Sequence, residues 1–312
     1  EKPMIKQQRL QWIITIIAVG TILWTTTPVT TALSAGALTV GEAYPDFSEG
    51  ILESAKLEKM DKSLLLKTNG FEIRDSFVKE IFGQVAPEIR KELEKNMLFL
   101  LDQEAMEELI TQDAKSMGIA TEPPNEQMFQ TYIDRVTKGA TVSEKAAKTF
   151  YDENKEMVGG MPFDQVKEAI QGLLLQQKKQ DTLQAHIQGL AKKAQMRINE
   201  DWVKEQIKLA RDNPLDRARL SGKPTMVQFS SSGCSPCEMM KPIVKKLQKK
   251  FADTINVISI PVSKNQMLAK RFNVRAVPVQ VFFDKNGKTV HHHMGFMAEA
   301  DIINQFKKMG AI

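Results

Sequence analysis

The stretch FSSSGCSPCEMMKP, Phe229–Pro242, holds the only two cysteines of the 312-residue chain, Cys234 and Cys237. The residues before it, TMVQFS at 225–230, form a continuous β-type run, and residues 238–251 have the apolar spacing of an amphipathic helix. The sequence therefore predicts that the cysteine pair lies where a strand ends and a helix begins.

This position of the pair favours redox chemistry. The N-terminus of a helix carries partial positive charge and free N–H groups, which favour the thiolate form of Cys234. Cys237 follows one helical turn later, so it can attack a mixed disulfide formed at Cys234. Pro236 restrains the turn between them and removes one backbone donor close to the sulfurs. We interpret the pair as a redox-active disulfide that needs no other cofactor.

Three other interpretations of the pair remain open. A zinc site needs two further ligands, and only His186 and the run His291–His293 could supply them. A structural disulfide across so short a loop removes little chain entropy. Two unreactive buried thiols are the third interpretation. On a strand, His291 and His293 share one face, so at most two of the run could hold one ion. We predict a solvated edge strand there and no metal site.

The residues after the pair alternate between helical and β-type patterns. Asp284–Lys288, DKNGK, has the composition of a hairpin turn. Strands that alternate with helices and end in a hairpin predict a small mixed α/β sheet. The stretches that carry this pattern are NVISIPV (256–262), NQMLAKRF (265–272), PVQVFF (278–283), TVHHHMGF (289–296) and AEADIINQFKKM (298–309).

Three ordered motifs between about Asn213 and Gly310 resemble the thioredoxin superfamily. They are GKPTMVQFSSSGCSPCEMMKPIVKKLQKKF (222–251), NVRAVPVQVFFDKNG (273–287) and HHMGF (292–296), which supplies the family's glycine as Gly295. The resemblance implies a cis peptide bond between Val277 and Pro278. It also implies that Val277 pairs with the backbone of an incoming polypeptide, and that Pro278 keeps this polypeptide near Cys234.

Four positions depart from the family pattern. Gly233 replaces the tryptophan that commonly precedes the first cysteine, which predicts a more open groove beside the sulfur. Gln228 stands at the position of the family's buried aspartate, with Ser259 in place of its lysine partner, and an amide cannot take a proton from the resolving thiol. Glu238 stands where a lysine is often found, and its charge opposes thiolate formation. These departures leave the reaction type intact and its rate, potential and direction open.

The N-terminal segment has the pattern of a bacterial export signal. Lys2, Lys6 and Arg9 precede the apolar run Leu10–Trp24, and small residues follow in SAGA at 34–37. The run is short for a spanning helix, which needs about 20 residues, although the threonines that follow would let it serve as an uncleaved anchor. A buried helix of a cytosolic domain would leave the basic flank unexplained. We predict a signal peptide or N-terminal membrane anchor at 1–41.

Charge divides the remaining chain into two segments. Residues 42–200 contain 21 Lys and Arg against 28 Asp and Glu, a net charge of −7, whereas residues 201–312 contain 19 against 9, a net charge of +10. Opposite signs favour two separately composed domains. The overall charge of +5 comes without a nucleic-acid recognition motif, so nucleic acid is not an expected partner.

The segment 42–200 is predicted to be almost all helical from about residue 69. Pro87 begins a helix that Gly118 ends, with apolar residues at every fourth position between them. Thr141 or Ser143 is the expected N-cap of a later helix. The other helical stretches are 124–137, 144–157 and 163–193.

Four stretches of this segment resemble the N-terminal helical chaperone region of SurA-type and other parvulin-class periplasmic foldases. They are TNGFEIRDSF (68–77), APEIRKELEKNMLFLLDQEAMEELITQDAKSMGI (86–119), TVSEKAAKTFYDENKEM (141–157) and PFDQVKEAIQGLLLQQKKQ (162–180). In such foldases a prolyl isomerase domain is usually inserted between the last two, where little more than VGG (158–160) stands here. The resemblance implies a helical domain that binds extended polypeptide and has no prolyl isomerase activity. Methionines such as Met97 and Met128 would serve it as adaptable apolar contacts, or else belong to its core.

The patterns together predict an all-helical SurA-N-like domain at 42–200, followed by a thioredoxin-fold α/β domain at 201–312. The expected function is an extracytoplasmic thiol–disulfide oxidoreductase in the bacterial periplasm or on the extracytoplasmic face of the inner membrane. The resemblance favours a reductase, because Pro236 precedes the second cysteine as a proline does in thioredoxin. Expected partners are unfolded or disulfide-containing protein clients, a membrane or periplasmic thiol-redox partner, and the membrane if the N-terminal segment is not cleaved. Two alternatives stay open: a periplasmic holdase or assembly factor whose thioredoxin fold is a docking module, and a thiol reductant for cytochrome c maturation.

Overall fold

The computed structural model describes residues 37–47, 50–120, 124–153 and 161–312. The chain forms two compact units, one of which contains residues 103–195 and the other residues 37–102 together with 196–312. The predicted signal or anchor at 1–41 lies outside the described residues up to residue 36. None of the helices that the structure describes has the length and apolarity needed to cross a membrane.

A small sheet joins the beginning and the middle of the chain within the second unit. Its strand order is β1-β4-β2-β3, in which β1 is parallel to β4 and the other neighbours are antiparallel. The prediction of an all-helical segment at 42–200 is therefore wrong for these residues. The strands are β1 (Lys56–Glu58), β2 (Leu64–Lys67), β3 (Glu72–Arg74) and β4 (Arg197–Asn199).

The helix predicted from Pro87 to Gly118 is broken in two. The break lies at Asn96, whose Nδ2 donates to the carbonyl oxygen of Glu92 at 2.7 Å. Helices α4 (Pro87–Glu94) and α5 (Met97–Ser116) flank it. The neighbouring elements are α2 (Val40–Ala43), η1 (Pro45–Phe47), η2 (Ile51–Ser54), α3 (Ser76–Gly83) and α9 (Glu200–Ala210).

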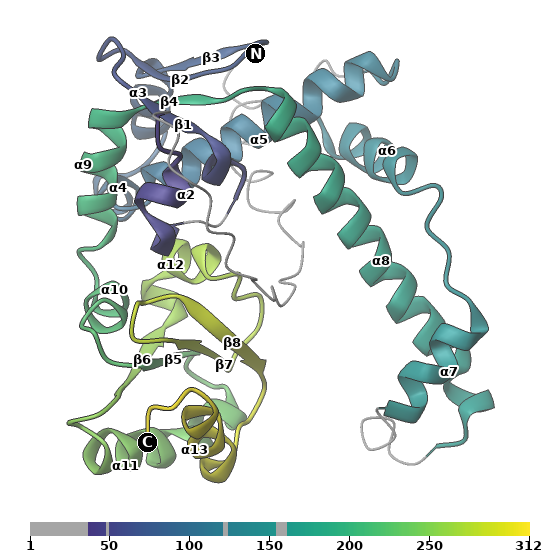
Figure 1. The fold of residues 1–312 in the computed structure, drawn as a ribbon, viewed down its shortest axis with the longest axis vertical. Coiled ribbons are helices and arrows are strands. Elements are labelled where there is room, and N and C mark those ends of the chain that lie inside the picture. Colours follow the sequence, from purple (N-terminus) through teal and green to yellow (C-terminus); the bar gives the residue numbers. More distant parts are fainter. Residues whose placement is uncertain (1–36, 48–49, 121–123, 154–160) are drawn as a thin grey trace. The chain divides into compact units, whose positions relative to one another are not determined.

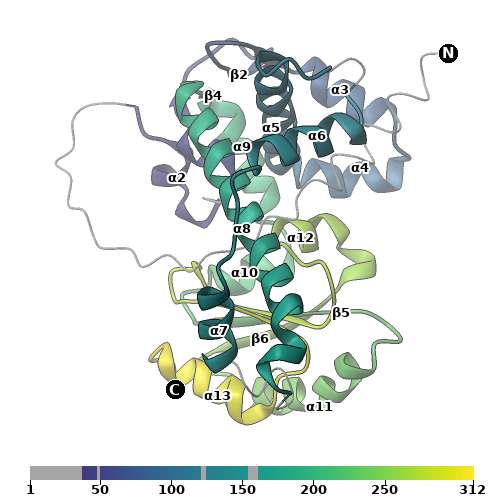
Figure 2. The same cartoon turned by 90° about the vertical axis from the view of Figure 1, so that its right-hand side faces the viewer.

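The C-terminal part of this unit is a four-stranded sheet with helices on both faces, as the α/β pattern predicted (Figure 1). The strand order is β6-β5-β7-β8, with β5 parallel to β6 and antiparallel to β7. Figure 2 shows α10 and α12 on one face and α11 and α13 on the other. The elements are α10 (Pro214–Arg219), β5 (Thr225–Ser230), α11 (Ser235–Lys250), β6 (Asn256–Pro261), η3 (Val262–Lys264), α12 (Gln266–Arg271), β7 (Val279–Phe283), β8 (Thr289–Met294) and α13 (Glu299–Lys308).

Two hydrophobic clusters hold these helices on the sheet. Leu215 and Leu268, from α10 and α12, pack with Phe229 and Val281 of the sheet. On the opposite face, α11 and α13 cover strand residues with Met240, Val244, Leu247, Ile302 and Phe306. The predicted hairpin turn is confirmed, since the N–H of Asp284 donates to the carbonyl oxygen of Lys288 at 2.9 Å.

Residues 37–102 pack against this α/β part rather than forming a separate lobe with the later helices. Met267 of α12 belongs to a cluster with Leu93 and Met97. Glu92 Oε1 accepts the N–H of Met267 at 2.9 Å, and the ring of Phe47 lies 4.1 Å from Cζ of Arg271. The grouping by packing thus differs from the predicted division into 42–200 and 201–312.

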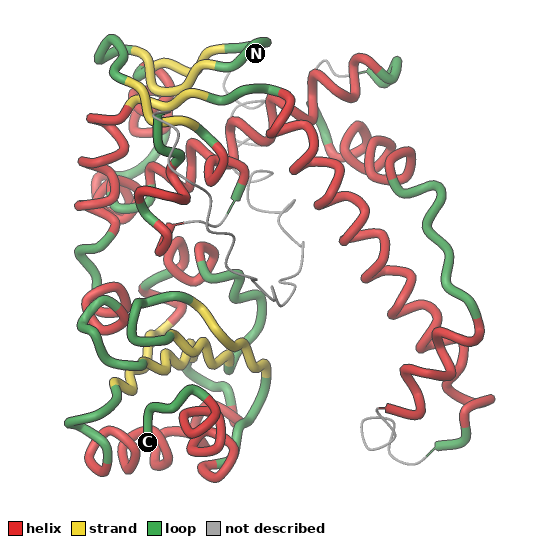
Figure 3. The backbone as a smooth tube through the Cα atoms, viewed as in Figure 1, coloured by secondary structure: helices red, strands yellow, loops and turns green. Residues whose placement is uncertain are grey.

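The other unit is helix and loop throughout its described residues (Figure 3). Besides the C-terminal part of α5 it contains α6 (Glu126–Val136), α7 (Glu144–Glu153) and α8 (Phe163–Lys193). The carboxylate of Asp113 accepts from Tyr132 Oη at 2.9 Å and lies 2.7 Å from His186 Nε2, which joins three of these helices. Ser143 rather than Thr141 accepts an N–H at the start of α7, from Ala146 at 3.2 Å.

Candidate functional site

The cysteine pair lies where the sequence predicted, between the end of β5 and the start of α11. Cys234 is the N-cap of α11, with extended backbone angles, and its Sγ accepts the N–H of Cys237 at 3.2 Å. The two residues are joined by a disulfide, and their Cα atoms are 5.2 Å apart. Pro236 lies in the first turn of α11, where its missing N–H leaves no helical bond unmade.

The two sulfurs differ in their access to solvent. Cys234 is partly exposed, whereas the side chain of Cys237 is 0% exposed. An incoming thiol or disulfide can therefore reach Cys234 first. Cys237 can act only on a sulfur that is already bonded to its neighbour, which is the geometry of a resolving cysteine.

The loop before β7 completes the site beside Cys234. The Val277–Pro278 peptide bond is cis, as the resemblance implied. The carbonyl oxygen of Val277 lies 3.7 Å from Cys234 Sγ, so this loop touches the accessible sulfur. Pro278 is buried, and its carbonyl oxygen accepts the N–H of Gly295 at 2.8 Å.

Gly233 leaves space beside the accessible sulfur. Its φ is +78°, a conformation that side chains rarely adopt, and a Cβ added to it would meet no described atom within 4 Å. The free space around Gly233 agrees with the more open groove that was predicted beside Cys234. Glu238, whose charge was expected to oppose thiolate formation, is exposed and paired with Lys241 at 2.6 Å, so part of its charge is compensated.

Gln228 is buried under the active-site helix, in register with Ser259 on β6 and with Gln280 on β7. The two glutamines are 1% and 0% exposed, and neither Oε1 has a hydrogen-bond partner among the described residues. Sequence reasoning missed Gln280. The sequence does contain a signal for it, because Gln280 is the only polar residue in the apolar run PVQVFF. A run that is apolar on both faces of a strand gives no reason for a polar side chain at this position.

The histidine run occupies the edge strand β8, as predicted, but it is not fully solvated. All three side chains are partly buried, and burial lowers the pKa of His291 and of His292 below the ordinary value of 6.5. His291 packs on the ring of Phe282, and His293 Nε2 lies 3.2 Å from the carbonyl oxygen of Phe296. His186, the other candidate zinc ligand, is bonded to Asp113 in the helical unit.

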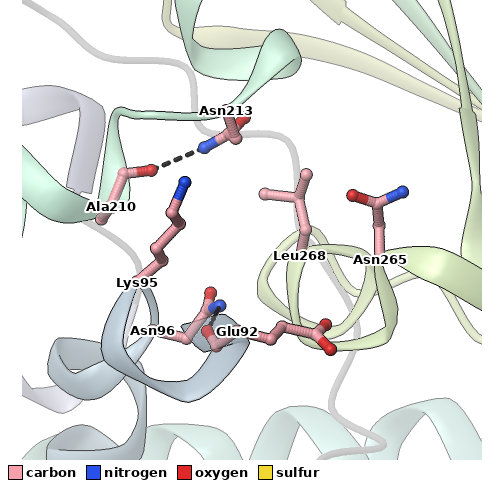
Figure 4. A pocket seen from close by; sticks show the side chains of 7 residues that line it. All are labelled: Glu92, Lys95, Asn96, Ala210, Asn213, Asn265 and Leu268. Atoms are coloured by element: carbon pink, nitrogen blue, oxygen red, sulfur yellow. Dashed lines mark hydrogen bonds between the residues drawn. The ribbon is translucent and has the colours of Figure 1, made fainter. Parts of the chain in front are cut away.

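A small pocket beside α12 is a second candidate site (Figure 4). Lys95 Nζ donates to the Asp212 side chain at 2.8 Å, Glu92 caps α12, and Asn213 Nδ2 donates to the carbonyl oxygen of Ala210 at 2.6 Å. These polar groups already serve the packing of the unit, so the cysteine pair remains the better candidate. The lining residues are Glu92, Lys95, Asn96, Ala210, Asn213, Asn265 and Leu268.

Comparison with known proteins gives the same assignment for the C-terminal part. Residues 207–308 match the family model Thioredoxin. The chain is 32% identical over 87 residues to a thioredoxin-like protein of Synechocystis sp., which covers 28% of this chain and 82% of that protein. The chain belongs to the thioredoxin family. The thioredoxin domain is also 38% identical over 81 residues to Thioredoxin H4 of Arabidopsis thaliana, covering 26% of this chain and 67% of that protein.

A third relative is matched over only part of its length. Thioredoxin Y, chloroplastic, of Oryza sativa subsp. japonica is 34% identical over 87 residues, which are 28% of this chain and 51% of the rice protein. The chain thus spans about half of that relative. Together these relatives support a thiol–disulfide oxidoreductase-like function for the thioredoxin domain.

Proposed function

We propose that this protein is an extracytoplasmic thiol–disulfide oxidoreductase that acts on polypeptide clients. The observation that carries the proposal is the asymmetry of the cysteine pair. Cys234 is accessible at a helix N-cap, 3.7 Å from the carbonyl oxygen before a cis-proline, and Cys237 is buried behind it.

The reduction of a client begins at Cys234. In the reduced protein its thiolate attacks one sulfur of a client disulfide, a mixed disulfide forms, and the other client sulfur leaves as a thiolate. The N-terminus of α11 favours the attacking thiolate. The backbone of Val277 would pair with the client chain next to this sulfur, as an added strand does.

Cys237 completes the exchange. Its sulfur attacks Sγ of Cys234, the Cys234–Cys237 disulfide forms, and the second client sulfur leaves with the electron pair. The client gains two electrons and two protons, and the cysteine pair loses them. A thiol-redox partner outside the cytoplasm would then have to reduce the pair again, because that compartment is oxidising. Pro236 before the second cysteine is the basis for favouring reduction over oxidation.

The helical unit would hold the client during this exchange. Leu173 on the long helix α8 is 52% exposed, and Met161, two residues before this helix begins, is 47% exposed. Apolar side chains are therefore accessible on this unit. Met128, by contrast, is 3% exposed and belongs to the unit's core, and Met97 is buried in the other unit. We therefore assign client contact to exposed residues such as Leu173 and not to these two methionines.

A trapping experiment tests this function. In Cys237→Ser the mixed disulfide cannot be resolved, so client proteins should remain bonded to Cys234 and should be released by a reductant. The matched control is the double variant Cys234→Ser with Cys237→Ser, which should trap nothing. If the single variant traps no protein while the double variant keeps full cellular function, the oxidoreductase proposal is wrong and a holdase with a docking thioredoxin domain explains the protein better.

A further inference from the structure

Two glutamines form a buried polar pair inside the thioredoxin sheet. Gln228 on β5 and Gln280 on β7 are directly opposite each other in the antiparallel register. Both side chains are at most 1% exposed, and both Oε1 atoms lack a hydrogen-bond partner among the described residues. Because a buried acceptor without a donor is unfavourable, a natural sequence rarely keeps two such groups side by side without a use for them.

The pair faces the active-site helix. Gln280 Nε2 donates to Sδ of Met240 at 3.1 Å, and Met240 lies on α11 one turn after Cys237. Cys237 and Met240 are both 0% exposed, so they share the face of α11 that covers the sheet. Residues opposite each other on paired strands point to the same side, which places Gln228 on this side as well.

The pair also lies under both loops of the site. Gln228 is near the end of the strand that leads to Cys234, and Gln280 comes two residues after Pro278. The residues that flank Gln228 and Gln280 directly along their strands are apolar and belong to the hydrophobic cluster on the opposite face of the sheet; they are Val227, Phe229, Val279 and Val281. The donor that suits two amide oxygens in this position is the thiol of the reduced Cys237, which is the buried sulfur of the same face.

We propose that the carbonyl oxygens of Gln228 and Gln280 are the acceptor site for the Cys237 thiol in the reduced protein. The proposal rests on the proposed oxidoreductase function. When the disulfide takes up two electrons, its S–S bond breaks and the Cys237 sulfur takes one proton from the reducing dithiol. The new S–H then donates to the glutamine pair, which has no such donor while the disulfide is closed.

This arrangement stabilises the dithiol relative to the disulfide. One S–H donates to one oxygen at a time, so the reduced state has one hydrogen bond and one unpartnered oxygen, whereas the oxidised state has two unpartnered oxygens. Replacing the glutamine that accepts this S–H with leucine therefore shifts the equilibrium toward the disulfide. The size expected for one neutral hydrogen bond is about fivefold in the equilibrium constant with glutathione, or about 20 mV, since a tenfold change corresponds to roughly 30 mV.

The two neutral amides also limit how Cys237 loses its proton in the resolving step. An amide oxygen does not act as a base, so the Cys237 proton must go to another group when its sulfur attacks the mixed disulfide. The departing client thiolate is the base that the reaction itself supplies. Cys237–SH and the Cys234–client disulfide then give the Cys234–Cys237 disulfide and a protonated client thiol, with atoms and electrons balanced.

The test compares redox equilibria of matched variants. Gln228→Leu and Gln280→Leu are each equilibrated with glutathione, beside the control Gln206→Leu. Gln206 on α9 also has a buried oxygen without a partner among the described residues, but it lies outside the thioredoxin sheet. We expect the variant that lacks the accepting glutamine, Gln228→Leu or Gln280→Leu, to favour the disulfide about fivefold, and we expect the control to match the wild type. Equal constants in all four proteins would overturn the proposal.

A second measurement does not depend on how well the leucine variants fold. In Cys234→Ser the only thiol left is Cys237, and its S–H stretching band in the infrared should lie at the lower frequency of a hydrogen-bonded thiol. A band at the frequency of a free thiol would contradict the proposal. If the wild-type protein exchanges with glutathione but Cys237→Ser traps no client, the proposed function fails while this proposal stands, because the glutathione and infrared measurements concern the cysteine pair alone.

Discussion

The buried carboxyl group of Asp102 should make the stability of the fold fall as the pH rises. Asp102 is 7% exposed, and its Oδ1 accepts the N–H of Leu52 at 2.9 Å at the start of η2. Burial raises the pKa of Asp102 from 3.8 to about 7, although backbone hydrogen bonds from Leu52 and Ile51 act in the opposite direction. The folded state is therefore more stable when the carboxyl group of Asp102 is protonated than when it is ionised.

The magnitude follows from the two pKa values of Asp102. Below pH 3.8 the group is protonated in both states and the fold loses nothing. Between 3.8 and about 7 the unfolded chain ionises while the folded chain stays protonated, which lowers the free energy of unfolding by about 1.4 kcal/mol per pH unit. Above pH 7 the loss is complete at about 4 kcal/mol.

The variant Asp102→Asn removes this ionisation and keeps one acceptor oxygen for the backbone. Urea unfolding at pH 5, 6, 7 and 8 can be followed by the fluorescence of Trp202, which packs in the cluster of Met97 and Leu100. From pH 5 to 8 the stability of the variant relative to wild type should rise by about 3 kcal/mol. Asp134→Asn, on the exposed side of α6, should show no such trend. A relative stability of Asp102→Asn that is independent of pH would refute the reasoning.

Two further substitutions test the packing of the thioredoxin domain. Gly287→Ala places a Cβ 3.0 Å from the carbonyl oxygen of Arg219, at a residue whose φ is +77°. This variant should lower the free energy of unfolding in urea by about 1–3 kcal/mol. The control Gly222→Ala also has a positive φ, but its added Cβ meets no described atom within 4 Å, so its free energy of unfolding should fall by less. Asp216→Asn leaves the side chains of Arg219 and Arg271 without their buried carboxylate and should cost about 3–5 kcal/mol in the same assay, whereas a loss below 1 kcal/mol would show that the ion pairs are not needed.

The active site was predictable because its determinants are local in sequence or belong to recognisable motifs. The β-type run at 225–230 and the helix after Cys234 carry strong periodic signals, and both are confirmed at nearly the predicted residues. The approach of Val277 to Cys234 depends on the pairing of β5 with β7, which no local pattern encodes. That contact was expected from the resemblance to thioredoxins alone.

The N-terminal part was harder to predict because its signals are short. Each of β1, β3 and β4 has three residues, too few for alternation to be recognised, and β4 pairs with β1 from far along the chain. The break between α4 and α5 has no proline or glycine to mark it, since Asn96 interrupts the helix through its own side chain. The SurA-like character of residues 42–200 stays a prediction.

The departures from the family pattern have a common physical consequence at the resolving cysteine. A row of residues crosses the sheet in register, from Ser259 through Gln228 and Gln280 to His293, and it contains no carboxylate. A buried carboxylate would titrate and make the redox equilibrium depend on its own pKa. Amides respond to the state of Cys237 only through hydrogen bonds, so Gln228 and Gln280 add no proton equilibrium of their own to the potential of this pair. A glutamine at position 228 therefore removes a base from the site and, with it, a source of pH sensitivity.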